Sequence, residues 1–119
     1  MSKVKVTYPG LSRSELVDRL KEPSSPLRKR LPVTRIILFG SYASNRFTAA
    51  SDIDLLVVYE DPERQDAYEI VANQLRLPRL EPRVYTESQY VAFLKTSPKF
   101  ASTLAREGIL ILGKGITNG

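Results

Sequence analysis

The sequence predicts an α+β fold, a small mixed β-sheet with helices packed on it. Two apolar runs at residues 34–39 and 52–59 have the composition of buried strands, and amphipathic helical patterns precede and follow them. The predicted order is helix, strand, strand, helix, strand, helix, helix, strand, which is not the regular alternation of a doubly wound parallel sheet. Because 119 residues suit one compact core, we expect residues 1–119 to form a single domain with its core at about 11–113.

The first helix is predicted over residues 12–21. Ser12 and Glu15 have the spacing of a capping box, and apolar residues then recur at helical intervals. One or two more turns are expected over residues 27–31, and Pro32 ends them. The chain is therefore expected to enter its sheet from a helical segment.

Two strands are predicted next. The run 34–39 (TRIILF) is apolar without alternation, which is typical of a strand buried on both faces. Gly40 ends this strand, and the small polar residues 41–51 predict a loop with room for a turn of helix at its start. The run 52–59 (DIDLLVVY) predicts the second strand.

A helix is predicted between the second and third strands. Asp61 and Pro62 suit an N-cap and a first turn, and the helix should end near Leu77. Its buried face is expected to carry Ala67, Ile70, Val71 and Leu75. The third strand is predicted over residues 80–86, and because Pro82 has no amide donor, it should be an edge strand or contain a bulge.

Two helices and a short strand complete the prediction. Thr86 and Gln89 form a second capping-box pattern, which begins a helix. Pro98 then opens a further helix to about Glu107, and a last strand is expected over residues 109–112. The first ten residues and the tail after Gly113 are expected to lie outside the core, although Val4 and Val6 alternate as in a strand.

Composition limits the chemistry. The chain has no cysteine and no histidine, which excludes disulfides, thiolate zinc sites, cysteine nucleophiles and an imidazole base. No apolar run approaches the roughly 20 residues that cross a bilayer, and the start lacks a secretory signal, so we expect a cytoplasmic protein with no membrane partner. The net charge of +5 suits a partner rich in phosphate or carboxylate, or simply a solvated surface.

Two aspartates head the second predicted strand. Asp52 and Asp54 are two residues apart, so both carboxylates should project from one face, about 6.5–7 Å apart along the strand. Two close carboxylates repel each other unless a cation neutralises them, and Mg²⁺ prefers such oxygen ligands. A strand-start cap or a partner for nearby arginines would explain the same pair without a metal.

Gly40 and Ser41 stand where the first predicted strand ends. A glycine lets a phosphate approach the backbone, and a serine hydroxyl can donate to a phosphate oxygen, as can the amides of a helix that begins there. The commoner role of such a pair is a strand terminator followed by a helix cap. The combination with the two aspartates, separated by residues 42–51, favours the phosphate-binding interpretation.

The stretch LFGSYASNRFTAASDIDLLVV resembles the nucleotidyltransferase superfamily that includes DNA polymerase β and kanamycin nucleotidyltransferase. Phe39, Ala43 and the run 51–55 look like its minimal, single-domain branch. The resemblance implies the nucleotidyltransferase fold and an NTP substrate. It also implies a triphosphate held at Gly40 and Ser41, and Mg²⁺ held by Asp52 and Asp54. A third carboxylate from a later strand is implied beside them, as a further metal ligand and as the group that activates the attacking hydroxyl.

The remaining site residues are assigned more loosely. Glu81 is the candidate third carboxylate, since alternation places it on one face with Arg83 and Tyr85, although a register slip at Pro82 would turn it away. Glu87 is a weaker substitute, and an ordinary salt bridge would also explain Glu81. Further candidates for nucleotide binding are Arg46, Arg83 and Ser51.

One residue departs from the minimal branch, which usually has glycine where this chain has Asn45. Asparagine tolerates the left-handed backbone conformation, so the turn should survive.

The resemblance implies transfer of a nucleoside monophosphate, AMP from ATP being favoured, to a hydroxyl acceptor. Minimal members are often encoded beside HEPN proteins as antitoxins, and some transfer AMP to a tyrosine of that partner. The alternative is a catalytically inactive module of the same fold that binds such a partner. A nucleic-acid-binding domain is less favoured, because the few aromatic residues show no stacking platform. Homo-oligomerisation is left open.

Overall fold

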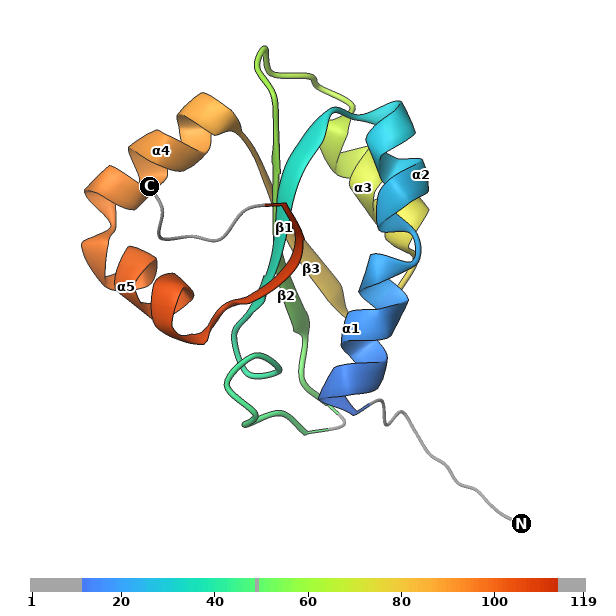
Figure 1. The fold of residues 1–119 in the computed structure, drawn as a ribbon, viewed down its shortest axis with the longest axis vertical. Coiled ribbons are helices and arrows are strands. Elements are labelled where there is room, and N and C mark those ends of the chain that lie inside the picture. The colour runs from blue at the N-terminus through green and yellow to red at the C-terminus, as the bar shows by residue number, and fades with distance from the viewer. Residues whose placement is uncertain (1–11, 49, 114–119) are drawn as a thin grey trace.

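The computed structural model describes residues 12–48 and 50–113, and in these ranges the chain forms one mixed four-stranded sheet (Figure 1). The strand order is β3-β2-β1-β4. β2 pairs in parallel with β3, whereas β1 pairs antiparallel with both β2 and β4. The bounds are β1 (Val33–Phe39), β2 (Ile53–Tyr59), β3 (Leu80–Thr86) and β4 (Ile109–Gly113). This arrangement confirms the predicted α+β fold.

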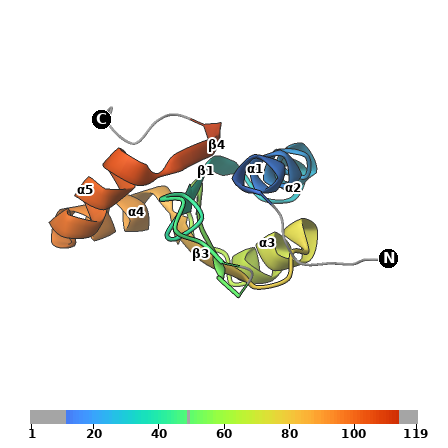
Figure 2. The same cartoon turned by 90° about the horizontal axis from the view of Figure 1, so that it is seen from below.

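Helices cover both faces of the sheet, as the view from below shows (Figure 2). One face carries α1 (Arg13–Lys21), α2 (Ser24–Arg30) and α3 (Ala67–Leu75). The other face carries α4 (Glu87–Thr96) and α5 (Pro98–Glu107). Within the described residues, no helix is long and apolar enough to span a bilayer.

The two central strands contribute to both hydrophobic layers. Ile36 and Leu38 of β1 belong to the larger core beneath the first three helices, and Ile37 belongs to the smaller core beneath α4 and α5. In β2, Leu55 and Leu56 divide between the two cores in the same way. Burial on both faces explains why these runs are apolar without alternation.

Both predicted capping boxes form. The amide of Glu15 donates to the Ser12 hydroxyl at 3.1 Å, and Thr86 and Gln89 reproduce this exchange at the start of α4. α2 begins at Ser24, earlier than the predicted turns at residues 27–31. The early start is compatible with the proline inside it, because the amides of a first helical turn have no partner within the helix.

The predicted start of the third helix is wrong. α3 begins at Ala67 with Asp66 as its N-cap residue, not at Asp61 and Pro62. The Asp61 carboxylate instead accepts hydrogen bonds from the amide and the hydroxyl of Ser88, at 3.2 and 2.5 Å. It therefore caps the first turn of α4, a contact across 27 residues that local pattern cannot show.

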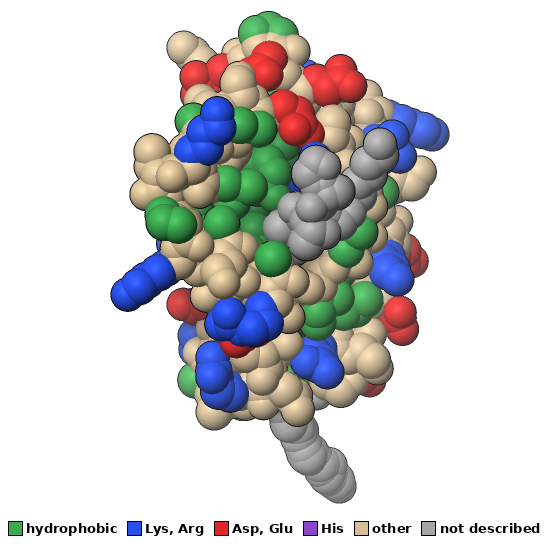
Figure 3. Space-filling model, turned by 60° about the vertical axis from the view of Figure 1, so that its left-hand side comes forward, with side chains coloured by type: hydrophobic (Ala, Val, Ile, Leu, Met, Phe, Trp, Pro, Cys, Tyr) green, Lys and Arg blue, Asp and Glu red, His purple; other side chains and the backbone are tan. Residues whose placement is uncertain are grey.

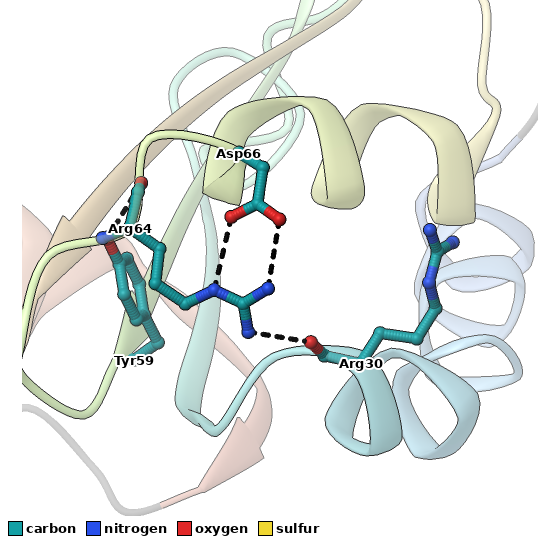
Figure 4. Close-up of polar contacts among 4 residues, drawn as sticks. All are labelled: Arg30, Tyr59, Arg64 and Asp66. Atoms are coloured by element: carbon teal, nitrogen blue, oxygen red, sulfur yellow. Dashed lines mark hydrogen bonds and ion pairs between the residues drawn. The ribbon is translucent and has the colours of Figure 1, made fainter.

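Arg64 fixes the segment that leads into α3 (Figure 4). Its guanidinium donates to both carboxylate oxygens of Asp66, at 3.1 and 2.9 Å, and to the carbonyl of Arg30 at 3.1 Å. Its amide donates to the Tyr59 hydroxyl at 2.8 Å. These contacts join the segment to α2 and to the end of β2. The helix α3 therefore begins only after this segment, at Ala67.

β3 is an edge strand, which confirms the interpretation of Pro82. Its register with β2 runs without a shift from Ile53 opposite Leu80 to Tyr59 opposite Thr86, so the slip considered at Pro82 does not occur. β4 continues one residue beyond its predicted end. The expectations for the first ten residues and for the tail after Gly113 lie outside the described residues.

Candidate active site

Gly40 begins a tight turn at the end of β1. It has φ +78, and its carbonyl accepts a hydrogen bond from the amide of Ser44 at 3.0 Å. The backbone carbonyl of Ser41 accepts one from the amide of Arg46 at 2.9 Å. These bonds close a hydrogen-bonded turn over residues 40–45, and no helix forms there. Asn45 has φ 65, the left-handed conformation expected of it.

The carboxylate of Asp54 lies directly against Gly40. A Cβ atom at position 40 would be 2.2 Å from Oδ2 of Asp54, far inside van der Waals contact. The strand register explains this approach, because Asp54 pairs with Phe39 and the next residue of that chain segment is the glycine. Glycine at position 40 therefore brings the predicted phosphate turn and the second aspartate together.

Glu81 lies opposite Asp54 on the neighbouring strand. The two residues are paired in the parallel ladder of β2 and β3, whose strands run about 4.8 Å apart. Tyr85, at the same parity as Glu81, packs on the core beneath α4 and α5, and so does Leu56, at the same parity as Asp54. Both carboxylates thus belong to the sheet face that α4 and α5 partly cover.

The pKa of Asp54 is raised above its ordinary value. Partial burial is the largest cause, and the negative charges of Asp52 and Glu81 add to it, whereas the positive charge of Arg83 lowers the pKa. Within the described residues, the Asp54 carboxylate has no hydrogen bond or ion pair. A partly buried carboxylate without a partner, beside two other negative charges, is an environment that a bound cation would stabilise.

This raised pKa predicts a pH-dependent stability. Between the unfolded pKa near 3.8 and the higher folded value, the folded state holds more protons, so the free energy of unfolding should fall as pH rises. Asp54→Asn removes the carboxylate and should raise the melting temperature at neutral pH, with the gain shrinking below pH 4. Thermal melts of both proteins across this range, without divalent cations, measure the effect. A lower melting temperature for the variant at pH 7 would contradict it.

Asp52 precedes β2 and faces an arginine that sequence reasoning did not single out. Nη1 of Arg79 lies 3.7 Å from Oδ1 of Asp52, and each side chain is 55% exposed. An exposed pair of this kind contributes at most about 1 kcal/mol, so it leaves Asp52 available to other cations. The two residues are 27 positions apart, and only the turn into β3 brings them together.

The donor set fits a hard divalent cation in its chemistry. Asp52, Asp54 and Glu81 offer only carboxylate oxygens, the ligands that Mg²⁺ prefers. Across residues 12–48 and 50–113, however, no three acidic side chains are already gathered into a metal site. The structure brings Asp54 and Glu81 to paired positions, and metal binding would have to draw the three carboxylates together.

The other predicted site residues are placed as follows. The Ser51 hydroxyl accepts from the amide of Thr48 at 2.9 Å, which closes the end of the loop, and Arg46 is exposed. Glu87 contacts the Thr34 hydroxyl, and its Oε1 lies 3.8 Å from Nη2 of Arg35. It follows the far end of β3, about 20 Å of strand from Glu81, so it cannot replace that residue.

A second contribution absent from the sequence prediction comes from α1. Nη1 of Arg13 donates to the carbonyl of Ala43 at 2.8 Å, inside the turn that follows Gly40. This bond fixes the turn to α1, across 30 residues of sequence. No local signal in the sequence pairs these two positions.

Two relatives are similar to part of this chain. Both are proteins of Methanocaldococcus jannaschii with the provisional name protein adenylyltransferase. One is 41% identical over 49 residues, which cover 41% of this chain and 50% of that protein. The other is 41% identical over 58 residues, which cover 48% and 59%. The chain thus matches little more than half the length of these relatives.

Solved structures share the fold. A toxin–antitoxin crystallised with AMP-PNP superposes with a TM-score of 0.52 at 21% identity, covering 79% of this chain and 73% of the other. A tri-AMPylated HEPN toxin of Shewanella oneidensis in complex with MNT antitoxin gives 0.50 at 20% identity, covering 82% and 73%. Residues 14–111 match the family described as the nucleotidyltransferase domain. The chain therefore belongs to the nucleotidyltransferase domain family, which confirms the predicted nucleotidyltransferase resemblance.

Proposed function

We propose that this nucleotidyltransferase uses Mg²⁺ to transfer a nucleoside monophosphate, AMP from ATP in the first instance, to a hydroxyl acceptor. The observation that carries the proposal is the contact of the Asp54 carboxylate with Gly40, beside the charges of Asp52 and Glu81. It joins the turn suited to phosphate with the acidic residues suited to a cation. Family membership supports the reaction class.

Each residue has a distinct part in the proposed reaction. Gly40 and Ser41 hold the triphosphate through the backbone and the hydroxyl, and Asp52 and Asp54 hold the metal ion. The bound Mg²⁺ offsets the negative charge that builds up on the phosphates. The acceptor oxygen attacks the α-phosphorus, the bond to the bridging oxygen breaks, and pyrophosphate leaves. Glu81 takes the proton of the acceptor hydroxyl.

The positively charged candidates are assigned by position. Arg46 is exposed beside the turn that Gly40 begins, which suits the outer phosphates. The positive charge of Arg83 lowers the pKa of Asp54 and so favours the ionised carboxylate. Ser51 is proposed to act indirectly, by closing the loop that leads into Asp52.

A protein hydroxyl is the proposed acceptor, specifically a tyrosine of a HEPN toxin that this chain counteracts as an antitoxin. The choice follows the provisional name of the two relatives, protein adenylyltransferase, and the AMPylated HEPN toxin among the structural neighbours. The described residues between Gly40 and Glu81 leave the carboxylate side open to a second molecule, because Asp52 and Glu81 are exposed. A partner would complete the acceptor half of the site.

A partner-binding module without catalysis is the second candidate. Figure 3 shows hydrophobic side chains gathered across the middle of the side on which α4 and α5 lie, below a group of acidic side chains. Among the described residues, Val91 of α4 is a large hydrophobic side chain that is 46% exposed. An apolar surface of this kind suits association with another protein.

Incubation with Mg²⁺, each α-labelled NTP in turn and the co-encoded partner protein tests the proposal. We expect label on the partner with ATP and, to a smaller extent or not at all, with the other nucleotides. If none of the NTPs labels the partner, under conditions in which the two proteins still associate, the result would favour the module without catalysis.

Glu81→Gln tests whether Glu81 acts as the third carboxylate or only as a surface charge. We expect kcat to fall by about 10²-fold or more, because the acceptor loses its base, while ATP binding stays within about twofold. Glu87→Gln, at the start of α4 just beyond the far end of β3, is the matched control and should leave kcat unchanged. Equal rates for the wild type and Glu81→Gln would remove Glu81 from the mechanism.

A further inference from the structure

Four aromatic side chains from four different elements form a continuous row on the α4 and α5 side of the sheet. The ring of Phe39 in β1 meets Phe100 of α5 edge-on, with centroids 5.3 Å apart. Phe100 contacts Phe93 of α4 at 5.2 Å, and Phe93 stacks on Tyr85 of β3 at 5.4 Å. The row starts at the end of β1 and ends on the edge strand.

The row begins beside the candidate active site. Phe39 is the ladder partner of Asp54 and the residue directly before Gly40. The guanidinium carbon of Arg83 lies 5.9 Å from the centroid of the Phe39 ring, over its face. Arg83 also lies close enough to Asp54 to lower the pKa of that carboxyl. An aromatic face and an exposed guanidinium plane therefore meet next to the proposed phosphate site.

Core packing does not account for all of this arrangement. Ile37 and Leu56, which lie deepest in the same layer, are 0% exposed, whereas all four rings keep part of their surface open to solvent. The Phe39 ring adjoins a charged side chain as well, the guanidinium of Arg83. Flat rings next to charge suit a ligand that is itself flat and joined to an anion.

We propose that Phe39 and Arg83 form the subsite for the nucleobase of the donor nucleotide, with Phe100 fixing the ring of Phe39. The inference rests on the proposed function, since it assumes that the phosphates lie at Gly40 and Ser41. It assigns Arg83 to the base and leaves Arg46 to the triphosphate.

The geometry requires only a small adjustment. A base in contact with both planes needs about 7 Å between them, twice the ~3.5 Å of van der Waals contact. Arg83 is an exposed side chain on an edge strand, so its guanidinium can move the additional distance of about 1 Å. The affinity from stacking depends on the area of the base rather than on its hydrogen-bonding pattern. Purine nucleotides should therefore bind more tightly than pyrimidine nucleotides.

Calorimetric titration with ATP and with inorganic tripolyphosphate, both with Mg²⁺, tests the subsite. Wild type should bind ATP at least about fivefold more tightly, because tripolyphosphate has no base to stack. Phe39→Leu keeps an apolar side chain but removes the ring, and should lower the affinity for ATP by about fivefold to tenfold while leaving that for tripolyphosphate unchanged. Phe93→Leu, in the same row but without contact to Phe39, is the matched control and should leave both affinities unchanged.

The outcomes separate the inference from the proposed function. If the wild type binds neither ligand, both fail. If it binds ATP and tripolyphosphate equally, only the base subsite fails. Equal losses for both ligands in Phe39→Leu would show that the ring only supports the turn. An unchanged ATP affinity with a higher KM for the partner would assign the row to the acceptor instead, and would also overturn the inference.

Discussion

Replacing Asp52 and Asp54 together by asparagine is expected to reduce transfer of an α-labelled nucleotide by at least about 10³-fold. Asparagine keeps the size of each side chain but has no negative charge with which to bind Mg²⁺. Without the metal ion, the negative charge of the phosphates is not neutralised. Labelling of the partner protein by ATP, followed over time at saturating Mg²⁺, measures the loss. Transfer that persists in the double variant would remove both residues from the site.

The double variant carries its own control against misfolding. Because burial and neighbouring negative charge raise the pKa of Asp54, the neutral variant should be at least as stable as the wild type at pH 7. Asp18→Asn, which changes an exposed carboxylate on α1, should keep full transfer. Loss of activity with unchanged or higher melting temperature is therefore the signature expected of a chemical role.

Gly40→Ala is expected to lose both stability and activity. The left-handed backbone at φ +78 alone costs an alanine about 1–2 kcal/mol, and the new methyl group would meet the Asp54 carboxylate at 2.2 Å. Relief of that clash must move Asp54 or the turn, and a displacement of about 1 Å in such a site costs about 10²-fold in rate. Denaturant unfolding and the labelling assay measure the two losses separately.

Gly113→Ala is the matched control for the glycine. This residue also has positive φ, and a Cβ atom there would be 2.1 Å from the carbonyl oxygen of Thr34, at the opposite end of the sheet. The variant should be destabilised as well, but its folded fraction should transfer label at the wild-type rate. If both alanine variants lose activity only in proportion to unfolding, the contact of Gly40 with Asp54 has no catalytic importance.

The sequence predicted the elements whose signals are local. Both capping boxes, the doubly buried central strands and the edge position of β3 were confirmed, because they depend on neighbouring residues or on one missing amide donor. The start of α3 was missed since Asp61 is committed to Ser88 and Arg64 to Asp66, Arg30 and Tyr59. Such contacts depend on how the layers meet.

The candidate site follows the same division. Spacing and residue chemistry together selected Gly40, Asp52 and Asp54, and alternation placed Glu81 on one face with Arg83 and Tyr85. The pairing of Glu81 with Asp54, and the approach of Arg79 to Asp52, depend on the parallel register of β2 and β3, which no single segment encodes. The contact of Asp54 with Gly40 likewise appears only when β1 and β2 are paired.

The edge position of β3 places the residues of the proposed reaction on strands of unequal local stability. Asp54 stands on a strand that is bonded on both sides, whereas Glu81 stands on a strand with one neighbour. Edge strands open more readily than central ones. A change that loosens β3 would displace Glu81 and Arg83 together, while Gly40 at the end of β1 and Asp54 on β2 stay in place. If the proposed function holds, a descendant of this chain that loosens β3 should lose transfer and base selectivity first and keep its affinity for a triphosphate longest.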